Sequence, residues 1–281
     1  ITKGELKYRL LDGGRTVSEK TLLNGLALEN GDYYELIKFT VQLPDSDQTV
    51  RYSLELILTD NGKEIARNAW DIWAYPTGTL DGLSGLDIRV YDPSNKLGLL
   101  GKYSWMKEWR NGFSEKPDLI VTTAMPSSIM AYLNLGGKVL YIGAGDGPVP
   151  VVEEWLYNRN VFSFLPDKGN PVAASLANEG YGALQFLELA TRYHMDYSAY
   201  AGHVGTPIIG KYNYTSNKIG AYVAEFNIGM GHLIQSTLRH DSRELRLGTD
   251  IFNYYTLHVD AYENVIGTYL LEKLIAYQVS K

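Results

Sequence analysis

Hydrophobic and polar residues alternate along much of residues 1–76, a pattern typical of β-strands that bury one face. Three runs show it clearly, at residues 6–10, 37–43 and 52–58. Turn-forming residues separate the runs, and Asn61-Gly62 favours a tight hairpin because both residues accept positive φ angles. About six or seven short strands at this spacing predict a small antiparallel β-sandwich.

The pattern changes after Pro76. Short apolar runs at residues 88–91, 119–123 and 138–143 predict buried strands. Between the last two, a segment of helical composition has Ser127 or Ser128 placed to cap it and Gly136-Gly137 to end it. A strand, a helix and a strand in this order predict a crossover unit, and hence a parallel sheet covered by helices.

Two helices and a hairpin are predicted towards the C-terminus. One helix is indicated by apolar residues at helical spacing: Ala183, Phe186, Leu187, Ala190 and Tyr193. Residues 229–231 separate two strand-like runs, which predicts a hairpin. The last helix is indicated by a capping pair, Asp260 and Glu263, and an apolar stripe: Tyr262, Val265, Ile266, Tyr269 and Leu270. The sequence therefore predicts a β-sandwich over residues 1–76 and an α/β domain with a mainly parallel sheet over residues 77–281.

Composition narrows the classes of function. The net charge of −6 argues against a nucleic-acid-binding surface. The absence of cysteine excludes disulfides, thiolate metal ligands and cysteine nucleophiles. No apolar run approaches the roughly 20 residues of a spanning helix, so no membrane partner is expected. The start at Ile1 resembles neither an initiator methionine nor a signal peptide, which predicts a cut inside a longer chain or a processed end.

Motifs that usually carry chemistry are weak in this chain. Residues 143–147 are Gly-rich, but Pro148 follows where a phosphate-binding loop would need amide donors, so we predict a plain loop and no cofactor. The five histidines offer no i, i+4 pair, and no metal is expected. Glu153 and Glu154 are adjacent rather than opposed across a substrate. We therefore assign no catalytic residue, and a hydrolase that uses Ser127 or Ser128 is a weaker alternative.

Aromatic side chains are the remaining signal, with 22 Tyr and 5 Trp. Aromatic rings stack on sugars, although they fill protein cores far more often. On this basis Trp105, Trp109 and Trp155 are candidate carbohydrate contacts. Trp105 and Trp109 are four residues apart and would share one face of a helix.

A Trp-rich segment closes the first predicted domain. Trp70 and Trp73 lie three apart in a predicted strand, so they would point to opposite faces. One of them is expected in the core and the other, with Tyr75, at the joint to the next domain. The segment as a whole, residues 68–76, resembles the N-x-W-x-x-W-x-Y-P close of the immunoglobulin-like domain found late in many family 2 glycoside hydrolases, the group that includes bacterial β-galactosidases.

The region after residue 76 is similar to the C-terminal part of the same enzymes, an α/β domain of the class I amidotransferase or flavodoxin-like type. The likeness rests on three segments, at residues 135–140, 170–186 and 229–234. Within the second segment, the resemblance makes Tyr181 and Gln185 candidate carbohydrate contacts. The chain departs from the family pattern there, because Asn170 replaces the usual His, and Leu184 and Phe186 replace two Trp.

The resemblance implies mainly what this chain does not do. Family 2 catalysis resides in a (β/α)₈ barrel of about 250 residues that carries two catalytic glutamates, so the catalytic domain would lie upstream and this chain alone would be inactive. The amidotransferase reaction needs a cysteine, which is absent. We therefore expect a non-catalytic accessory region, with a carbohydrate-binding module as the alternative. The expected partners are the upstream barrel, carbohydrate and a second copy of the chain, and the family implies export to the periplasm or outside the cell.

Overall fold

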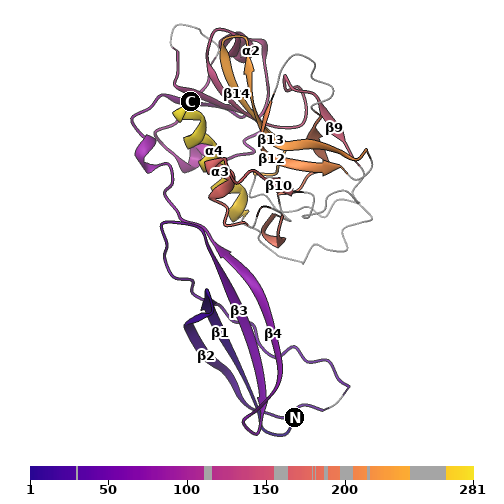
Figure 1. Cartoon of the computed structure of the whole chain (residues 1–281). Coiled ribbons are helices and arrows are strands. Elements are labelled where there is room, and N and C mark those ends of the chain that lie inside the picture. The colour runs from indigo at the N-terminus through magenta and orange to yellow at the C-terminus, as the bar shows by residue number, and fades with distance from the viewer. Residues whose placement is uncertain are drawn as a thin grey trace. The chain divides into compact units, whose positions relative to one another are not determined.

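The computed structural model describes residues 1–29, 31–110, 116–154, 164–178, 180, 182–186, 189–196, 205–213, 216–240 and 264–281. The chain divides into two compact units, Ile1–Pro76 and Thr77–Lys281 (Figure 1). Both are built mostly from β-strands, with few helices. Within the described residues, none of the helices has the length and apolar character needed to cross a bilayer.

The first unit holds an antiparallel sheet of four strands in the order β2-β1-β3-β4. Its strands are β1 (Gly4–Asp12), β2 (Arg15–Leu26), β3 (Val50–Asp60) and β4 (Lys63–Ala74). Asn61 and Gly62 join β3 to β4 with φ angles of 50° and 77°, as a primed hairpin turn requires. The hairpin predicted from this pair is confirmed.

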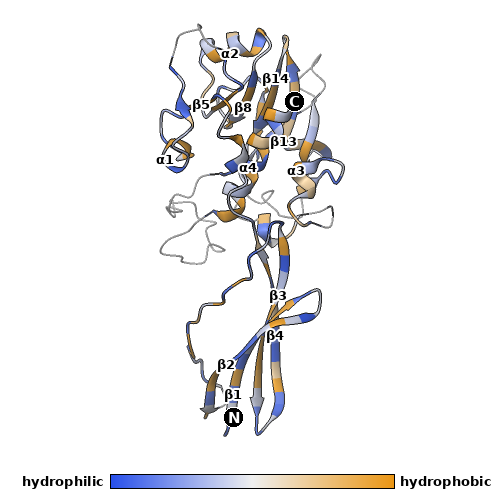
Figure 2. Cartoon of the chain, turned by 90° about the vertical axis from the view of Figure 1, so that its left-hand side faces the viewer, coloured by the Kyte–Doolittle hydropathy of each residue, from blue (hydrophilic) through white to orange (hydrophobic). Residues whose placement is uncertain are grey.

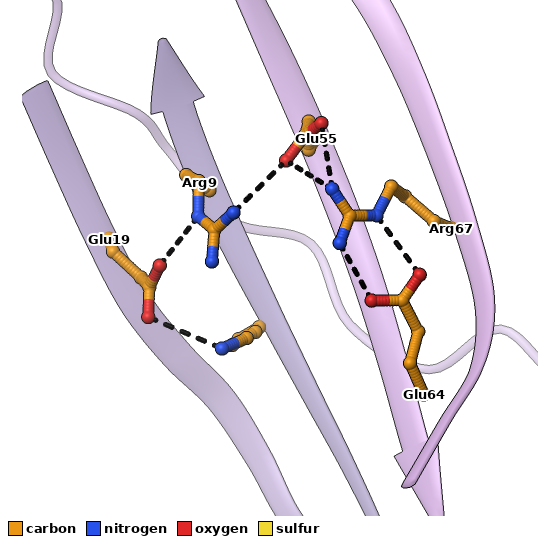
Figure 3. A network of polar contacts seen from close by, with 6 residues as sticks. Arg9, Glu19, Glu55, Glu64 and Arg67 are labelled. Atoms are coloured by element: carbon orange, nitrogen blue, oxygen red, sulfur yellow. Dashed lines mark hydrogen bonds and ion pairs between the residues drawn. The ribbon is translucent and has the colours of Figure 1, made fainter. Parts of the chain in front are cut away.

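The two faces of this sheet differ in polarity. Along β1, Leu6, Tyr8 and Leu10 are buried on one face, where the ring of Phe39 stacks on Tyr8 at 5.7 Å. The opposite face carries an ion-pair network that runs across all four strands (Figure 3). Alternation of hydrophilic and hydrophobic residues along the strands is visible in Figure 2. The sheet is therefore amphipathic, as period-two patterning predicts.

The predicted strand at residues 37–43 is wrong. The structure places no strand there, although the alternation is real: Phe39, Val41 and Leu43 are half-buried, whereas Thr40 and Gln42 are exposed. An extended segment can bury alternate side chains against a sheet without joining its hydrogen-bond ladder. As a result, the described part of this unit has one four-stranded sheet in place of the six or seven strands in two sheets that were predicted.

The second unit holds a mixed sheet of ten strands. The strands are β5 (Ile88–Tyr91), β6 (Lys107–Glu108), β7 (Leu119–Thr122), β8 (Lys138–Ile142), β9 (Val151–Glu153), β10 (Phe164–Pro166), β11 (Tyr193–Met195), β12 (Thr206–Asn213), β13 (Lys218–Ile228) and β14 (Gly231–Ser236). The main order is β10-β12-β13-β14-β8-β7-β5-β6, and β9 and β11 extend it beside β13. Strands β14, β8, β7, β5 and β6 pair in parallel, and the remaining pairs are antiparallel. The sheet is thus mixed where a mainly parallel one was predicted, because the pairs formed among β9 to β14 are antiparallel.

The predicted crossover is confirmed. Helix α2 (Ser127–Asn134) joins the parallel strands β7 and β8, and Gly136 ends it with a φ of 93°. The cap is different from the one predicted, since Pro126 occupies the N-cap and makes no side-chain cap bond. The hairpin at residues 229–231 is also confirmed, between β13 and β14.

The helix predicted from Ala183 to Tyr193 is wrong. Its described residues contain only a short 3₁₀ turn, Leu184–Phe186, and the start of β11. Phe186, Leu189 and Ala190 are nevertheless buried. Buried positions outside a helix therefore mimicked helical spacing, and Leu187 of the predicted face lies outside the described residues. The other helices, α1 (Leu99–Lys102) and α3 (Pro171–Ala174), and the 3₁₀ turn Asp81–Leu83 are short.

The last helix, α4 (Val265–Ser280), is buried on most sides and packs against β7 and β8 (Figures 1 and 2). Asn264 caps it by accepting a hydrogen bond from the Gly267 amide at 2.8 Å. Asp260 and Glu263, the predicted capping pair, lie outside the described residues. Near its end, the Gln278 amide donates to the carbonyls of Val139 (3.0 Å) and His232 (2.7 Å). Helix α4 is thus fixed to the edge of the sheet where β8 and β14 begin.

Candidate functional site

Trp105 and Trp109 do not share a helical face, because residues 103–108 form a turn and the short strand β6. Trp109 is 3% exposed, with its ring 6.1 Å from that of Tyr132 and 5.9 Å from the Arg89 guanidinium. Trp105 is half-buried, with its ring 5.9 Å from that of Tyr103. The predicted shared helical face is therefore wrong, and Trp109 is a core residue, whereas contact of Trp105 with carbohydrate stays a prediction.

The segment around Gln185 also faces the interior. Gln185 is half-buried in its 3₁₀ turn, and the adjacent ring of Phe186 stacks on Phe164 at 5.2 Å. Trp155 and Tyr181, the other two candidate contacts, lie outside the described residues. The role of Gln185 in binding carbohydrate stays a prediction.

Trp70 and Trp73 lie on opposite faces of β4. Trp70 is opposite Leu54 of β3, on the apolar face, and is 44% exposed. Trp73 is opposite Arg51 and is half-buried, as is Tyr75 just beyond the strand. Their place at a joint between the units stays a prediction.

The Gly-rich loop at residues 143–147 packs on the chain's own aromatic ring. A Cβ added at Gly147 would lie 2.3 Å from Tyr141 Cε1, and one added at Gly143 would lie 2.7 Å from the Tyr141 hydroxyl. Glycine is needed at both positions so that the loop can close over Tyr141. This packing explains the glycines at positions 143 and 147.

A cavity of about 480 Å³ opens beside the β13–β14 hairpin, where β8 and β14 begin. This volume lies within the range of small-molecule sites, about 300–1,000 Å³. Its polar lining includes Lys138, Glu225, Asn227, His232 and Lys281. None of the predicted carbohydrate contacts that the structure describes lines it, so sequence reasoning missed this site.

The carboxylate of Glu225 is the centre of the cavity's polar groups. It accepts a hydrogen bond from the Tyr277 hydroxyl at 3.2 Å, and the Lys281 ammonium lies 3.1 Å from it. Hydrogen bonds of Lys281 with Tyr277 and with Glu225 raise the pKa of its ammonium against the opposing effect of burial, so that its charge is retained. His232 Nε2 lies 3.5 Å from the same carboxylate oxygen that Lys281 contacts.

Gln278 fixes the orientation of His232. The His232 Nδ1 atom lies 2.7 Å from Gln278 Oε1, and an amide oxygen can only accept, so Nδ1 carries the proton. The cavity therefore presents a carboxylate, an imidazole and ammonium groups in fixed positions. Such groups can accept hydrogen bonds from the hydroxyls of a polar ligand and donate hydrogen bonds to them. Among the described lining residues, the one Phe, Tyr or Trp ring, that of Phe226, is buried and not open for stacking.

A second polar cluster is buried between four strands of the same sheet. The Lys211 ammonium donates to Glu154, and His194 Nε2 lies 3.8 Å from the other oxygen of that carboxylate. All three residues are under 9% exposed, and the ring of Tyr222 lies 5.6 Å from Lys211 Nζ. Burial lowers the pKa of Lys211 to about 8. Because the amine is paired and buried, we interpret the cluster as structural.

His194 makes this cluster sensitive to acid. Burial lowers the pKa of His194 below its ordinary value of 6.5, so below that pH the unfolded chain binds a proton that the folded chain does not. We expect the free energy of unfolding to fall as the pH drops below about 6.5, by at most about 1.4 kcal/mol per pH unit from this residue. Urea unfolding at several pH values measures it.

A His194→Asn variant should show a weaker fall in the free energy of unfolding between pH 6.5 and 5 than the unaltered chain shows. Equal slopes for the unaltered chain and His194→Asn would contradict the prediction.

Two further polar groups lie near a smaller cavity of about 130 Å³. There the buried carboxylate of Glu272 accepts hydrogen bonds from Lys102 at 2.6 Å and from Thr79 and Tyr103. Nearby, Ser236 Oγ lies 2.8 Å from His240 Nε2, and His240 Nδ1 donates to the Gly267 carbonyl at 2.9 Å.

Ser236 and His240 have the relation of a serine nucleophile and its base. Ser236 is fully buried, however, and the pair joins the end of β14 to the first turn of α4. This pair was missed from the sequence, because only pairs of histidines at metal-ligand spacing and serines flanked by glycines were considered. A serine and a histidine four residues apart after a strand were the available signal. Within the described residues, no three His, Asp or Glu side chains gather to hold a metal ion.

A family model matches the first unit. Residues 1–76 match a family described as "Domain of unknown function (DUF8488)". No curated protein matches the chain. The family match ends at the same residue, Pro76, as the first compact unit.

Proposed function

We propose that this chain is the non-catalytic C-terminal accessory region of a family 2 glycoside hydrolase, similar to β-galactosidases, whose catalytic barrel lies upstream. The observation that carries the proposal is the place of the Trp-rich segment. Residues 68–74 complete β4, the last strand of the first unit, and the unit ends at Pro76. In the family that this segment resembles, the same motif closes the immunoglobulin-like domain before the next domain begins.

The two sheets support the finer fold assignments. We propose that the amphipathic four-stranded sheet corresponds to one layer of an immunoglobulin-like domain, with residues 31–46 over part of its apolar face. In the second unit, we assign the parallel strands β14, β8, β7 and β5, with α2, to the proposed amidotransferase-like domain. The antiparallel strands β9 to β13 would be an elaboration of that domain.

The buried carboxylates support an accessory role. Glu154 is paired with Lys211, and Glu272 with Lys102 and two hydroxyls. A glycosidase needs two carboxyl groups about 5–10 Å apart on either side of the sugar bond that it cleaves. Carboxylates that are held in internal ion pairs are not available for this role. The region would instead pack beside the barrel, shape access to it or hold two copies together. Export from the cell would follow from the family.

Glycosidase assays test this proposal directly. We expect the purified chain to release no p-nitrophenol from β-galactoside, β-glucuronide or β-mannoside substrates. A version extended upstream to include the proposed barrel should hydrolyse at least one of them. Turnover by the chain itself, or an upstream sequence without a barrel and its two glutamates, would refute the assignment.

Carbohydrate binding is the second candidate, and the cavity around Glu225 favours it. Its volume and fixed polar groups suit one or two sugar rings held by hydrogen bonds. Hydrogen bonds to a charged group contribute about 1.5–3 kcal/mol each. We therefore expect Glu225→Gln to weaken oligosaccharide binding by roughly tenfold to a hundredfold, measured by calorimetric titration.

Asp146→Asn, at an exposed loop residue, is the matched control for the loss of one carboxylate and should bind as the unaltered chain does. No heat with a broad panel of oligosaccharides, or equal affinities for the two variants, would refute binding at this cavity.

A further inference from the structure

Strand β4 is an exposed edge of the first unit's sheet. It pairs with β3 on one side, and within the described residues no strand pairs with its other side. Every residue from Lys63 to Asp71 is exposed. Exposed edges of this length are templates for pairing with another chain unless the sequence protects them.

The other edge of the same sheet is protected. The pairing of β2 with β1 shifts register at three places, and Gly25 in β2 has a φ of 70°. Bulges of this kind twist an edge away from a partner. In contrast, the pairing of β4 with β3 shifts only once, beside Glu64, so residues 66–74 form a regular strand.

The backbone of β4 offers hydrogen-bonding groups at this open edge. The amide N–H of Ala69 donates to the side chain of Asn68 at 3.0 Å, which is a local substitute for a neighbouring strand. In an antiparallel ladder, alternate residues direct their backbone groups to the same side. Arg67 and Asp71 therefore share the direction of Ala69.

We propose that a second copy of this chain pairs with the first through β4, antiparallel, with Ala69 opposite Ala69 on the two-fold axis. This register places Arg67 opposite Asp71 twice, once on each side of the axis. On the other face it places Ala66 opposite Ile72 and Asn68 opposite Trp70. Opposite charges in directly opposed positions stabilise antiparallel pairs, and a two-fold axis doubles each contact.

Neighbouring registers lose this complementarity. With Asn68 on the axis, Arg67 would face Ala69 and Asp71 would face Ile65. With Trp70 on the axis, Arg67 would face Trp73 and Asp71 would face Ala69. Arg67 and Asp71 are the only charged residues in the regular part of β4, and they have opposite signs. The sequence of the strand therefore selects the register centred on Ala69.

Both faces of the sheet would be continued across the pair. On the charged face, Glu19, Arg9, Glu55 and Arg67 form consecutive ion pairs, and the second copy's Asp71 would extend this network (Figure 3). On the apolar face, the two Trp70 rings, each 44% exposed, would occupy diagonal positions within reach of each other. Pairing would bury the largest exposed ring of this face.

Cross-linking at the axis tests the register, because the chain contains no cysteine. Directly opposed residues lie about 5.5 Å apart between Cα atoms in a hydrogen-bonded pair, which a disulfide can bridge. We expect the full chain with Ala69→Cys to form a disulfide-linked dimer under mild oxidation. Thr21→Cys, at an exposed position of the other edge, should remain unlinked. Equal linking of the two variants, or no linking at Ala69→Cys, would overturn the proposal.

Light scattering on a sizing column tests the association itself. We expect the full chain to elute at twice its 31.5 kDa. Asp71→Lys and Arg67→Glu should each elute as monomers, because each places like charges opposite one another. A mixture of the two should form a heterodimer, since its two contacts, Arg67 with Asp71 and Lys with Glu, are both complementary. The proposal would be overturned if the unaltered chain were monomeric, or if a mixture of the two folded variants stayed monomeric. Circular dichroism establishes that the variants are folded.

Discussion

Glu154→Gln is expected to lower the free energy of unfolding by about 3–5 kcal/mol, because it leaves the ammonium of Lys211 buried without its carboxylate. Lys211 is 1% exposed, so water cannot replace the lost partner. Glu154, His194, Lys211 and Tyr222 come from or directly follow four different strands, β9, β11, β12 and β13. The loss would therefore loosen the antiparallel half of the sheet. Urea unfolding followed by tryptophan fluorescence measures it.

The double variant Glu154→Leu with Lys211→Met is the matched control. Replacing a buried ion pair by apolar residues of similar volume is often neutral or stabilising, so most of the stability should return. Arg192→Ala, which breaks an exposed pair with Glu153, should cost less than about 1 kcal/mol. A loss for Glu154→Gln as small as that of Arg192→Ala would show that the pair is not buried in solution.

Glu272→Ala is expected to lower the free energy of unfolding by about 1–3 kcal/mol, because it removes the acceptor of the buried Tyr103 hydroxyl together with the hydrogen bonds from Thr79 and Lys102. Its side chain joins α4 to Thr79, Lys102 and Tyr103, all from the first part of the second unit. The buried Tyr103 hydroxyl would lose its acceptor, whereas Lys102 is half-exposed and can be hydrated. Lys102→Ala should therefore cost less than about 1 kcal/mol.

The lowered pKa of Glu272 predicts a second loss of folding free energy in acid. Burial raises the pKa of Glu272, but hydrogen bonds from Lys102, Thr79 and Tyr103 outweigh it and hold the pKa below its ordinary value of 4.5. A lowered folded-state pKa means that this contribution is complete above about pH 4.5 and is lost as the pH falls through the lower value. Glu272→Gln should flatten the pH dependence below 4.5. An unchanged acid limb would contradict the assignment.

The sequence predicted correctly those elements that depend on turn residues and on the order of neighbouring strands and helices. Asn61-Gly62 specifies a hairpin because it accepts the positive φ angles of the turn. The apolar runs of β7 and β8, with a helix between them, specify a parallel pair. The hairpin is decided within a few residues, whereas the crossover pairs residues such as Ile120 and Val139 across one intervening helix.

The signals failed where packing, rather than hydrogen bonding, set the pattern. Residues 37–43 alternate because one side of an extended segment is half-buried, and period two does not reveal whether a ladder forms. Phe186 and Ala190 are both buried at helical spacing, although Phe186 lies in a 3₁₀ turn and Ala190 in no helix. A propensity argument cannot distinguish these from a strand and a helix.

The polar groups of the candidate site could not be found from local sequence at all. Glu225 and His232 are seven residues apart, but the β13–β14 hairpin brings their side chains together, and Tyr277 and Lys281 reach them from α4. Likewise Glu154 and Lys211 are 57 residues apart. Such clusters depend on strand order and register, which the hydrophobic pattern does not specify.

The position of α4 has a consequence for how the chain folds as it is made. The parallel strands β7 and β8 are complete by residue 142, yet the helix that packs on them begins at Val265. A ribosome adds about 5–20 residues per second, so α4 would be synthesised several seconds after the strands on which it packs. During that interval their apolar surface would be open to chaperones, and a chain released before residue 265 would be a target for proteolysis.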